Sequence, residues 1–117
     1  MIASYKDLEV YQDGYRLAVE MYQLTTKLPA EAFELAKQLR RATLSIPLNI
    51  AEGYGKKDST AEFKRFLRMA TGSANEVEVL IEMLKDLGYI DRCTYEKYVN
   101  AYMTLGKRLN VLHQKWR

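Results

Sequence analysis

The segment DSTAEFKRFLRMATGSANEVEVLIEMLKDLG, residues 58–88, decides the fold class of this 117-residue chain. Ser59 and Glu62 form the S-x-x-E pattern of a capping box, which satisfies free backbone amides at the start of a helix. The spacing that follows predicts one long amphipathic helix of about 40 Å, ending at Gly88. Its apolar residues recur in steps of three and four, and they are Phe63, Phe66, Ala70, Ala74, Val77, Ile81 and Leu84.

Three other segments show the same helical periodicity, and none alternates like a half-buried strand. The first closes at Leu28-Pro29, because a residue before proline is pushed out of the α region, and the last is capped by Asp91. Short connections favour antiparallel neighbours, so the sequence predicts an all-α fold, a single-domain antiparallel up-down-up-down four-helix bundle over residues 1–117. The three stripes are Leu8, Tyr11, Tyr15, Ala18 and Tyr22, widened by Leu17, Met21 and Leu24; Leu35, Leu39, Ala42, Ile46 and Ile50; and Tyr95, Tyr98, Tyr102, Leu105, Leu109, Leu112 and Trp116.

Pro47 interrupts the second stripe without ending it. A proline inside a helix has no amide hydrogen and its ring collides with the carbonyl four residues back, here Thr43, at a cost of about 3 kcal/mol. Because the apolar spacing continues to Ile50, we expect a proline-kinked but continuous second helix. The alternative is a helix that stops before the proline and restarts there. Gly53 and Gly55 then allow the left-handed backbone that ends many helices.

Tyrosines and the proline segment also favour contacts between copies of the chain. Most of the nine tyrosines follow the helical stripes, where amphipathic rings suit core edges and subunit interfaces. Base stacking is the alternative role for them. The stripes of the first and last segments are too wide for one bundle core, and Ile46-Pro47-Leu48 should give the kinked helix an apolar outer face, which together predict a homo-oligomer. The residues predicted at the kink or oligomer interface are Ile46, Pro47, Leu48, Asn49 and Glu52.

Basic side chains gather in two blocks, although the net charge is only +3. Residues 37–68 hold eight basic and three acidic side chains, and residues 97–117 hold five basic and none acidic. Residues 1–36 and 69–96 are acidic, with net charges of −3 and −4. A polyanion could bind the basic blocks, and the alternation of basic with acidic blocks could equally serve salt bridges between copies. For RNA or DNA, the predicted phosphate contacts are Lys37, Arg40, Arg41, Lys56, Lys57, Lys64, Arg65 and Arg68.

Catalytic chemistry has little support in the sequence. His113 is the only histidine and lies beside an apolar stripe, and Cys93 is the only cysteine. The E-x-x-H motifs of di-iron bundles are absent. We therefore predict no enzymatic activity, catalytic residue, metal or cofactor. A lone cysteine, no signal-peptide pattern and no apolar run near 20 residues predict a cytoplasmic protein that is not bound to a membrane.

Three motifs resemble those of a known family. The central motif QLRRATLSIPLNIAEGYGK, residues 38–56, is similar to the signature of the 23S ribosomal RNA intervening-sequence proteins, a bacterial four-helix-bundle family. The motifs YKDLEVYQ, residues 5–12, and EFKRFLRMATGSANEVE, residues 62–78, resemble other patterns of that family. The resemblance covers nearly the whole chain.

This resemblance implies a ring-shaped homopentamer of four-helix bundles. A related group comprises accessory proteins of diversity-generating retroelements, which implies RNA or DNA and a reverse transcriptase as candidate partners. The expected function is a non-enzymatic oligomer that binds nucleic acid through basic surfaces of the ring. The alternative is a structural protein-interaction ring, or an accessory subunit of a reverse transcriptase without direct sequence-specific nucleic-acid binding.

Overall fold

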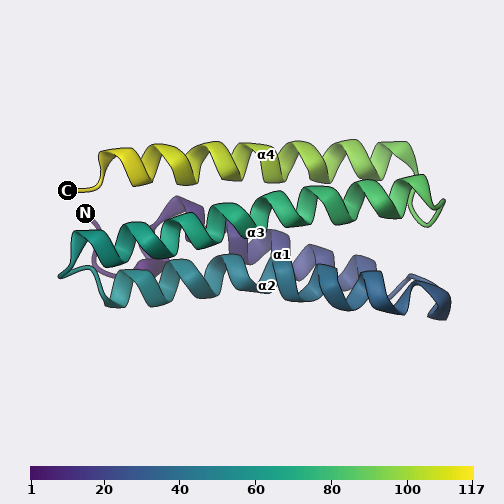
Figure 1. Cartoon of the computed structure of the whole chain (residues 1–117), viewed down its shortest axis with the longest axis horizontal. Helices are drawn as coiled ribbons and strands as arrows, with labels where there is room; N and C mark the ends of the chain where they lie inside the picture. The colour runs from purple at the N-terminus through teal and green to yellow at the C-terminus, as the bar shows by residue number, and fades with distance from the viewer.

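Four α-helices make up most of the chain, and the computed structural model, which describes all 117 residues, contains no strand. The bundle is elongated, 45 × 21 × 20 Å, and consecutive helices run in opposite directions (Figure 1). The predicted all-α four-helix fold is confirmed, and no helix is apolar over enough length to cross a membrane. The elements are η1 (Tyr5–Asp7), α1 (Glu9–Thr25), η2 (Ala30–Ala32), α2 (Phe33–Gly55), α3 (Thr60–Asp86) and α4 (Arg92–Lys115), where η marks a 3₁₀ turn.

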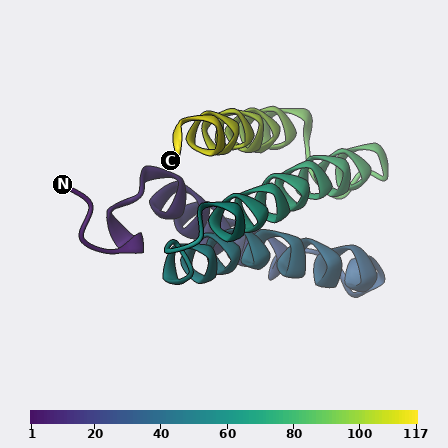
Figure 2. The same ribbon diagram turned by 60° about the vertical axis from the view of Figure 1, so that its left-hand side comes forward.

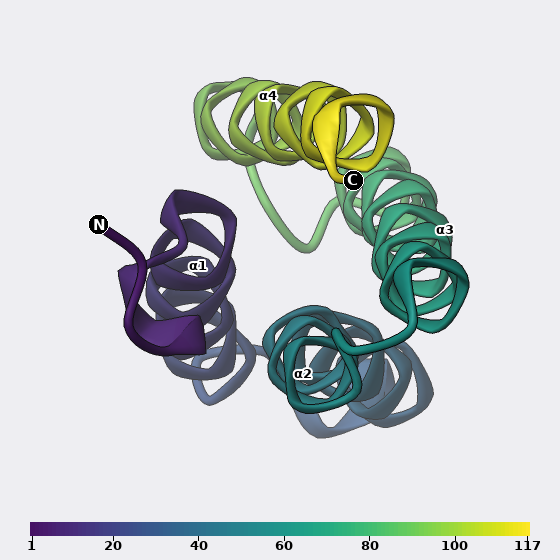
Figure 3. The ribbon, with the colours of Figure 1, turned by 90° about the vertical axis from the view of Figure 1, so that its left-hand side faces the viewer.

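The helices follow one another around the bundle in chain order. α2 packs against both α1 and α3, and α4 packs against α3, whereas α1 and α4 touch each other least (Figure 3). The N-terminal segment passes through η1 into α1 (Figure 2), and the two chain ends lie at the same end of the bundle (Figure 1). Each outer helix is therefore held mainly along one side.

The core face of α3 and the residue that caps its start are those predicted from the sequence. Every apolar position of the predicted stripe is buried, and the Ser59 hydroxyl accepts a hydrogen bond from the Glu62 amide at 3.2 Å. The Glu62 carboxylate pairs with Arg65 at 3.0 Å, so the returning half of the predicted capping box does not form. Asp91 caps α4 as predicted, accepting a hydrogen bond of 2.7 Å from the amide three residues later.

α1 buries only part of the stripe predicted for it, since Leu17 and Met21 are buried as expected whereas Tyr15 and Tyr22 are not. Tyr15 and Tyr22 are each 56% exposed, because these large amphipathic rings lie at the edge facing α2, where the Arg40 guanidinium sits 4.4 Å from the centre of the Tyr22 ring. Gly14 brings α1 close to α2, since an added Cβ would lie 3.1 Å from Cγ2 of Ile46. The residues that α1 buries are Val10, Gly14, Leu17, Met21 and Thr25.

α2 runs unbroken through Pro47, which excludes a stop and restart at the proline, while the kink itself stays a prediction. Ile46 is fully buried in the core, and Pro47 is buried with its ring near Gly14 of α1. Of the apolar surface expected at residues 46–48, only Leu48 faces outward, 58% exposed. The prediction of an outer apolar face for all three residues was therefore wrong, because the first two point toward the core and α1.

The predicted left-handed backbone at Gly53 and Gly55 was also wrong. Both residues belong to α2, and the only positive φ of the chain, 83°, occurs at Gly88 after α3. The Lys56 amide donates to the Gly53 carbonyl at 3.0 Å, so a tight final turn ends the helix without a left-handed residue. Gly53 instead allows close packing, since an added Cβ would lie 2.6 Å from Cβ of Phe66.

Candidate nucleic-acid interface

The packing register of α2 and α3 divides the eight predicted phosphate-contacting residues into two groups. Ser45 shares a hydrogen bond with Ser73, and Gly53 packs on Phe66, so the start of α2 lies beside the end of α3. Nine helical rises, about 14 Å, therefore separate the level of Arg41 from that of Arg68, the nearest predicted phosphate-contacting residue of α3. The first group is Lys37, Arg40 and Arg41, and the second is Lys56, Lys57, Lys64, Arg65 and Arg68.

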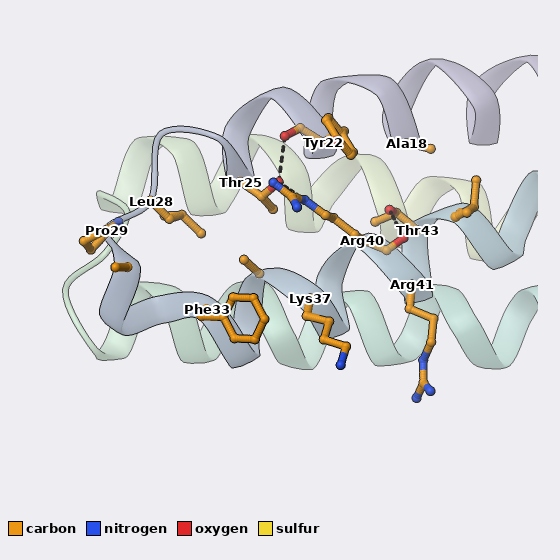
Figure 4. Close-up of a pocket in the computed structure, with 13 residues that line it drawn as sticks. Ala18, Tyr22, Thr25, Leu28, Pro29, Phe33, Lys37, Arg40, Arg41 and Thr43 are labelled. Atoms are coloured by element: carbon orange, nitrogen blue, oxygen red, sulfur yellow. Dashed lines mark hydrogen bonds between the residues drawn. The ribbon is translucent and has the colours of Figure 1, made fainter.

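Arg40 of the first group is turned toward α1. Its Nε donates to the Thr25 hydroxyl at 2.7 Å, as the close-up of the α1–α2 pocket shows (Figure 4). Its guanidinium also lies over the Tyr22 ring. Lys37 and Arg41 are exposed and point away from α1. Two of the three cations in this group are thus free to meet a partner, and the third holds α1 to α2.

Several cations of the second group already have partners. Lys56 pairs with Glu52 at 3.6 Å, and Arg65 pairs with the Glu62 carboxylate. Lys57 lies 4.5 Å from the centre of the Tyr54 ring. Lys64 and Arg68, four residues apart on one face of α3, make no ion pair with any carboxylate.

α4 contributes a residue that sequence reasoning assigned to packing. Nε of Arg68 donates to Nε2 of His113 at 3.1 Å, and the Phe63 ring meets the Trp116 ring at 4.6 Å between centres. These contacts place the last turns of α4 beside the first turns of α3. Partial burial, followed by the charges of Arg68 and Lys64, lowers the pKa of His113 below its ordinary value. The lowered pKa favours the neutral imidazole, the form whose Nε2 can accept the hydrogen bond from Arg68.

We call residues 60–72 and 106–117, which adjoin in this way, the basic end of the bundle. It carries seven Lys and Arg side chains and one carboxylate, whereas residues 73–105 between them carry three cations and six carboxylates. Two of the seven cations are in ion pairs, Arg65 and also Arg108, which contacts Asp13 at 2.6 Å. The cations without a carboxylate partner are Lys64, Arg68, Lys107, Lys115 and Arg117. The sequence signalled the α3 part of this end through the basic block 37–68 and the α4 part through the basic block 97–117.

The remaining predicted interface residues have local roles. Nδ2 of Asn49 donates to the Ser45 carbonyl within α2 at 2.8 Å, and Glu52 binds Lys56. No three His, Cys, Asp or Glu side chains are grouped so that they could hold a metal ion. The arrangement that stands out chemically is therefore the unpaired positive charge of the basic end.

Comparison with known proteins agrees with this architecture. No curated protein matches the chain. A solved structure of a protein with unknown function from the S23 ribosomal protein family, from Bacteroides thetaiotaomicron VPI-5482, is similar at a TM-score of 0.84 and 31% sequence identity. The match covers 91% of this chain and 96% of that one. Residues 6–111 match the family described as 23S rRNA-intervening sequence protein. The chain belongs to the 23S rRNA-intervening sequence protein family.

Proposed function

We propose that this chain is a non-enzymatic, homo-oligomeric protein of the bacterial cytoplasm that binds RNA or DNA through phosphates at its basic end. The observation that carries the proposal is the set of five cations there without a carboxylate partner. Lysine and arginine contacts to phosphate release counterions and supply most sequence-independent affinity. The bundle offers no base-reading motif, so little sequence preference is expected.

Oligomerisation strengthens such binding, because several modest sites act together on one polyanion. A ring, with five copies as the resemblance implies, would carry one basic end per copy. Exposed apolar side chains such as Leu48 support an assembly of this kind. Light scattering coupled to size-exclusion chromatography tests it, and a monomer mass at micromolar concentration contradicts it.

The binding test is a fluorescence-anisotropy titration with structured RNA and duplex DNA at 50 and 200 mM salt. If four phosphates are contacted, affinity falls about 100-fold between these concentrations. Lys64→Glu with Arg68→Glu should abolish binding at low salt while the oligomer remains. The matched control is Arg92→Glu with Lys97→Glu, an equal change of charge on exposed residues in the first turns of α4, outside the basic end, which should bind like the wild type.

A structural interaction ring, including an accessory subunit of a reverse transcriptase, is the second candidate function. The same exposed apolar residues favour it, because they serve contacts between proteins whether or not nucleic acid is bound. An intact oligomer that binds neither RNA nor DNA at 50 mM salt would contradict nucleic-acid binding and leave this candidate.

A further inference from the structure

We infer that copies of this chain meet head to tail, with the outer face of the α1–α2 pair of one copy against the outer face of α3 of the next. The inference rests on the oligomeric part of the proposed function and is independent of nucleic-acid binding. It follows from two apolar surfaces on different sides of one bundle, one beside unpaired cations and the other beside unpaired carboxylates.

The first surface, called the α1–α2 face, is unusually apolar for the outside of a bundle. Leu44 and Leu48, four residues apart on one side of α2, are 53% and 58% exposed. Two adjoining pockets of about 540 and 340 Å³ connect the helices here, and both are lined by Ala18, Tyr22 and Leu44. The large exposed residues of this face are Tyr15, Val19, Tyr22, Phe33, Leu44 and Leu48.

Positive charge flanks the middle of this face, whereas Glu34 and the Lys56-paired Glu52 lie at its two ends on α2. Arg41 lies three residues and Lys37 seven residues before Leu44, which places all three on one side of α2. Neither cation contacts a carboxylate of its own chain. The two pockets that define the face have no acidic residue in their walls.

The second surface, called the α3 face, consists of the exposed residues Val79, Met83 and Leu87, and it is flanked by negative charge. Val79 is 57% exposed, and Glu76 and Glu82 each lie three residues from it. Neither carboxylate has an ion-pair partner in the chain. Residues 69–84 contain no lysine or arginine at all.

The α1–α2 face of one copy fits the α3 face of another copy better than either face fits the same face of a second copy. Placing the α1–α2 face on the α3 face buries apolar side chains from both and brings unpaired cations near unpaired carboxylates, a complementarity that selects partner and register. A contact of either face with its own copy would gather like charges. Because α3 lies beyond α2 from α1 (Figure 3), one copy can engage two neighbours, and such a heterologous contact generates a closed ring when its rotation closes.

The test uses two variants that each disable one face, Leu44→Glu and Val79→Glu. Both positions are exposed, so the fold should survive, which circular dichroism checks. Each variant alone should have the 13.6 kDa mass of a single chain in light scattering at 100 µM. An equimolar mixture should form a two-chain species, because the first variant keeps its α3 face and the second keeps its α1–α2 face. Asn100→Glu, at an exposed α4 position on neither face, is the control and should assemble like the wild type.

Other outcomes overturn the inference. If Leu44→Glu is monomeric and Val79→Glu assembles normally, or the reverse, one face alone carries the contact. If both are monomeric and the mixture stays monomeric, the faces do not meet each other. A monomeric wild type, or two variants that assemble normally, excludes both surfaces. RNA binding is measured separately through Lys64 and Arg68, so loss of one result leaves the other standing.

Discussion

Gly53 packs directly on α3, and a Cβ there would fall 2.6 Å from Cβ of Phe66. Gly53→Ala should therefore push the helices apart and lower the free energy of unfolding by about 1–3 kcal/mol. Gly106→Ala in α4 is the matched control, because an added Cβ there meets no atom within 4 Å. The control should raise the free energy of unfolding by about 0.5–1 kcal/mol, since alanine favours a helix. Urea denaturation measures both, and equal effects would contradict the close approach.

The Tyr102 hydroxyl is fully buried and has no hydrogen-bond partner among the protein atoms. Tyr102→Phe should raise the free energy of unfolding by about 1 kcal/mol, because it removes a desolvated polar group and keeps the ring. Tyr98→Phe is the contrast, since the Tyr98 hydroxyl donates to the Glu20 carboxylate at 2.9 Å. That change should lower the free energy of unfolding by a similar amount in the same urea titration. A loss of stability in Tyr102→Phe would show that its hydroxyl is satisfied in solution.

At the scale of single residues, the sequence predicted the structure least well. Periodicity counts Tyr15 and Tyr22 as apolar, yet a tyrosine satisfies its hydroxyl and much of its ring at a surface, so the predicted α1 stripe extended too far toward the surface. Gly53 looked like a helix stop because a close approach between two helices has no local signature. These errors share one cause, since the packing environment of each residue is determined by a neighbour that is distant in sequence.

At the scale of elements, replacing Pro47 tests whether the proline's effect on α2 matters for assembly. Pro47→Ala restores an amide donor toward Thr43 and should leave the helix content intact, raise the stability of the monomer by up to about 3 kcal/mol and weaken the oligomer. Circular dichroism, urea denaturation and light scattering measure the three effects. Assembly equal to that of the wild type would make the proline a tolerated local feature.

The stability of the packing between α3 and α4 should depend on pH through the titration of His113. Burial, Arg68 and Lys64 lower the pKa of His113 in the folded chain below the ordinary value of about 6.5. The unfolded chain therefore binds a proton first as the pH falls, so stability is greatest above that value and is lost as pH falls toward the lowered pKa. Urea denaturation between pH 7.5 and 5 should show this loss, and His113→Gln should remove it. An unchanged slope in the variant would assign the effect to another group.

The spans of the four helices followed from sequence because their causes are local. The Ser59 and Asp91 caps mark where α3 and α4 begin, and the α3 stripe identifies its core face. The continuation of α2 through Pro47 was likewise predictable from unbroken apolar spacing. Register between helices was not predictable, because it depends on contacts such as Ser45 with Ser73 that no single helix encodes.

For the whole molecule, that missing register explains how the candidate site differs from its prediction. The sequence treated residues 37–68 as one basic block, whereas antiparallel packing sends its two halves toward opposite ends of the α2–α3 pair. The same packing brings His113 beside Arg68, across 45 residues of sequence. The composition of the site was thus visible in part, and its location required the fold.

The sparse contact between α1 and α4 has a consequence for motion (Figure 3). Only α2 and α3 have a packed neighbour on both sides, so an outer helix can detach while the central hairpin persists, at a smaller cost than global unfolding. In hydrogen–deuterium exchange of the dissociated chain, amides of α1 and α4 should exchange well before those of α2 and α3. Uniform protection of all four helices would show that the bundle opens only as a unit. The dissociated chain should then behave as a rigid hairpin of α2 and α3 to which α1 and α4 are attached as two more mobile helices.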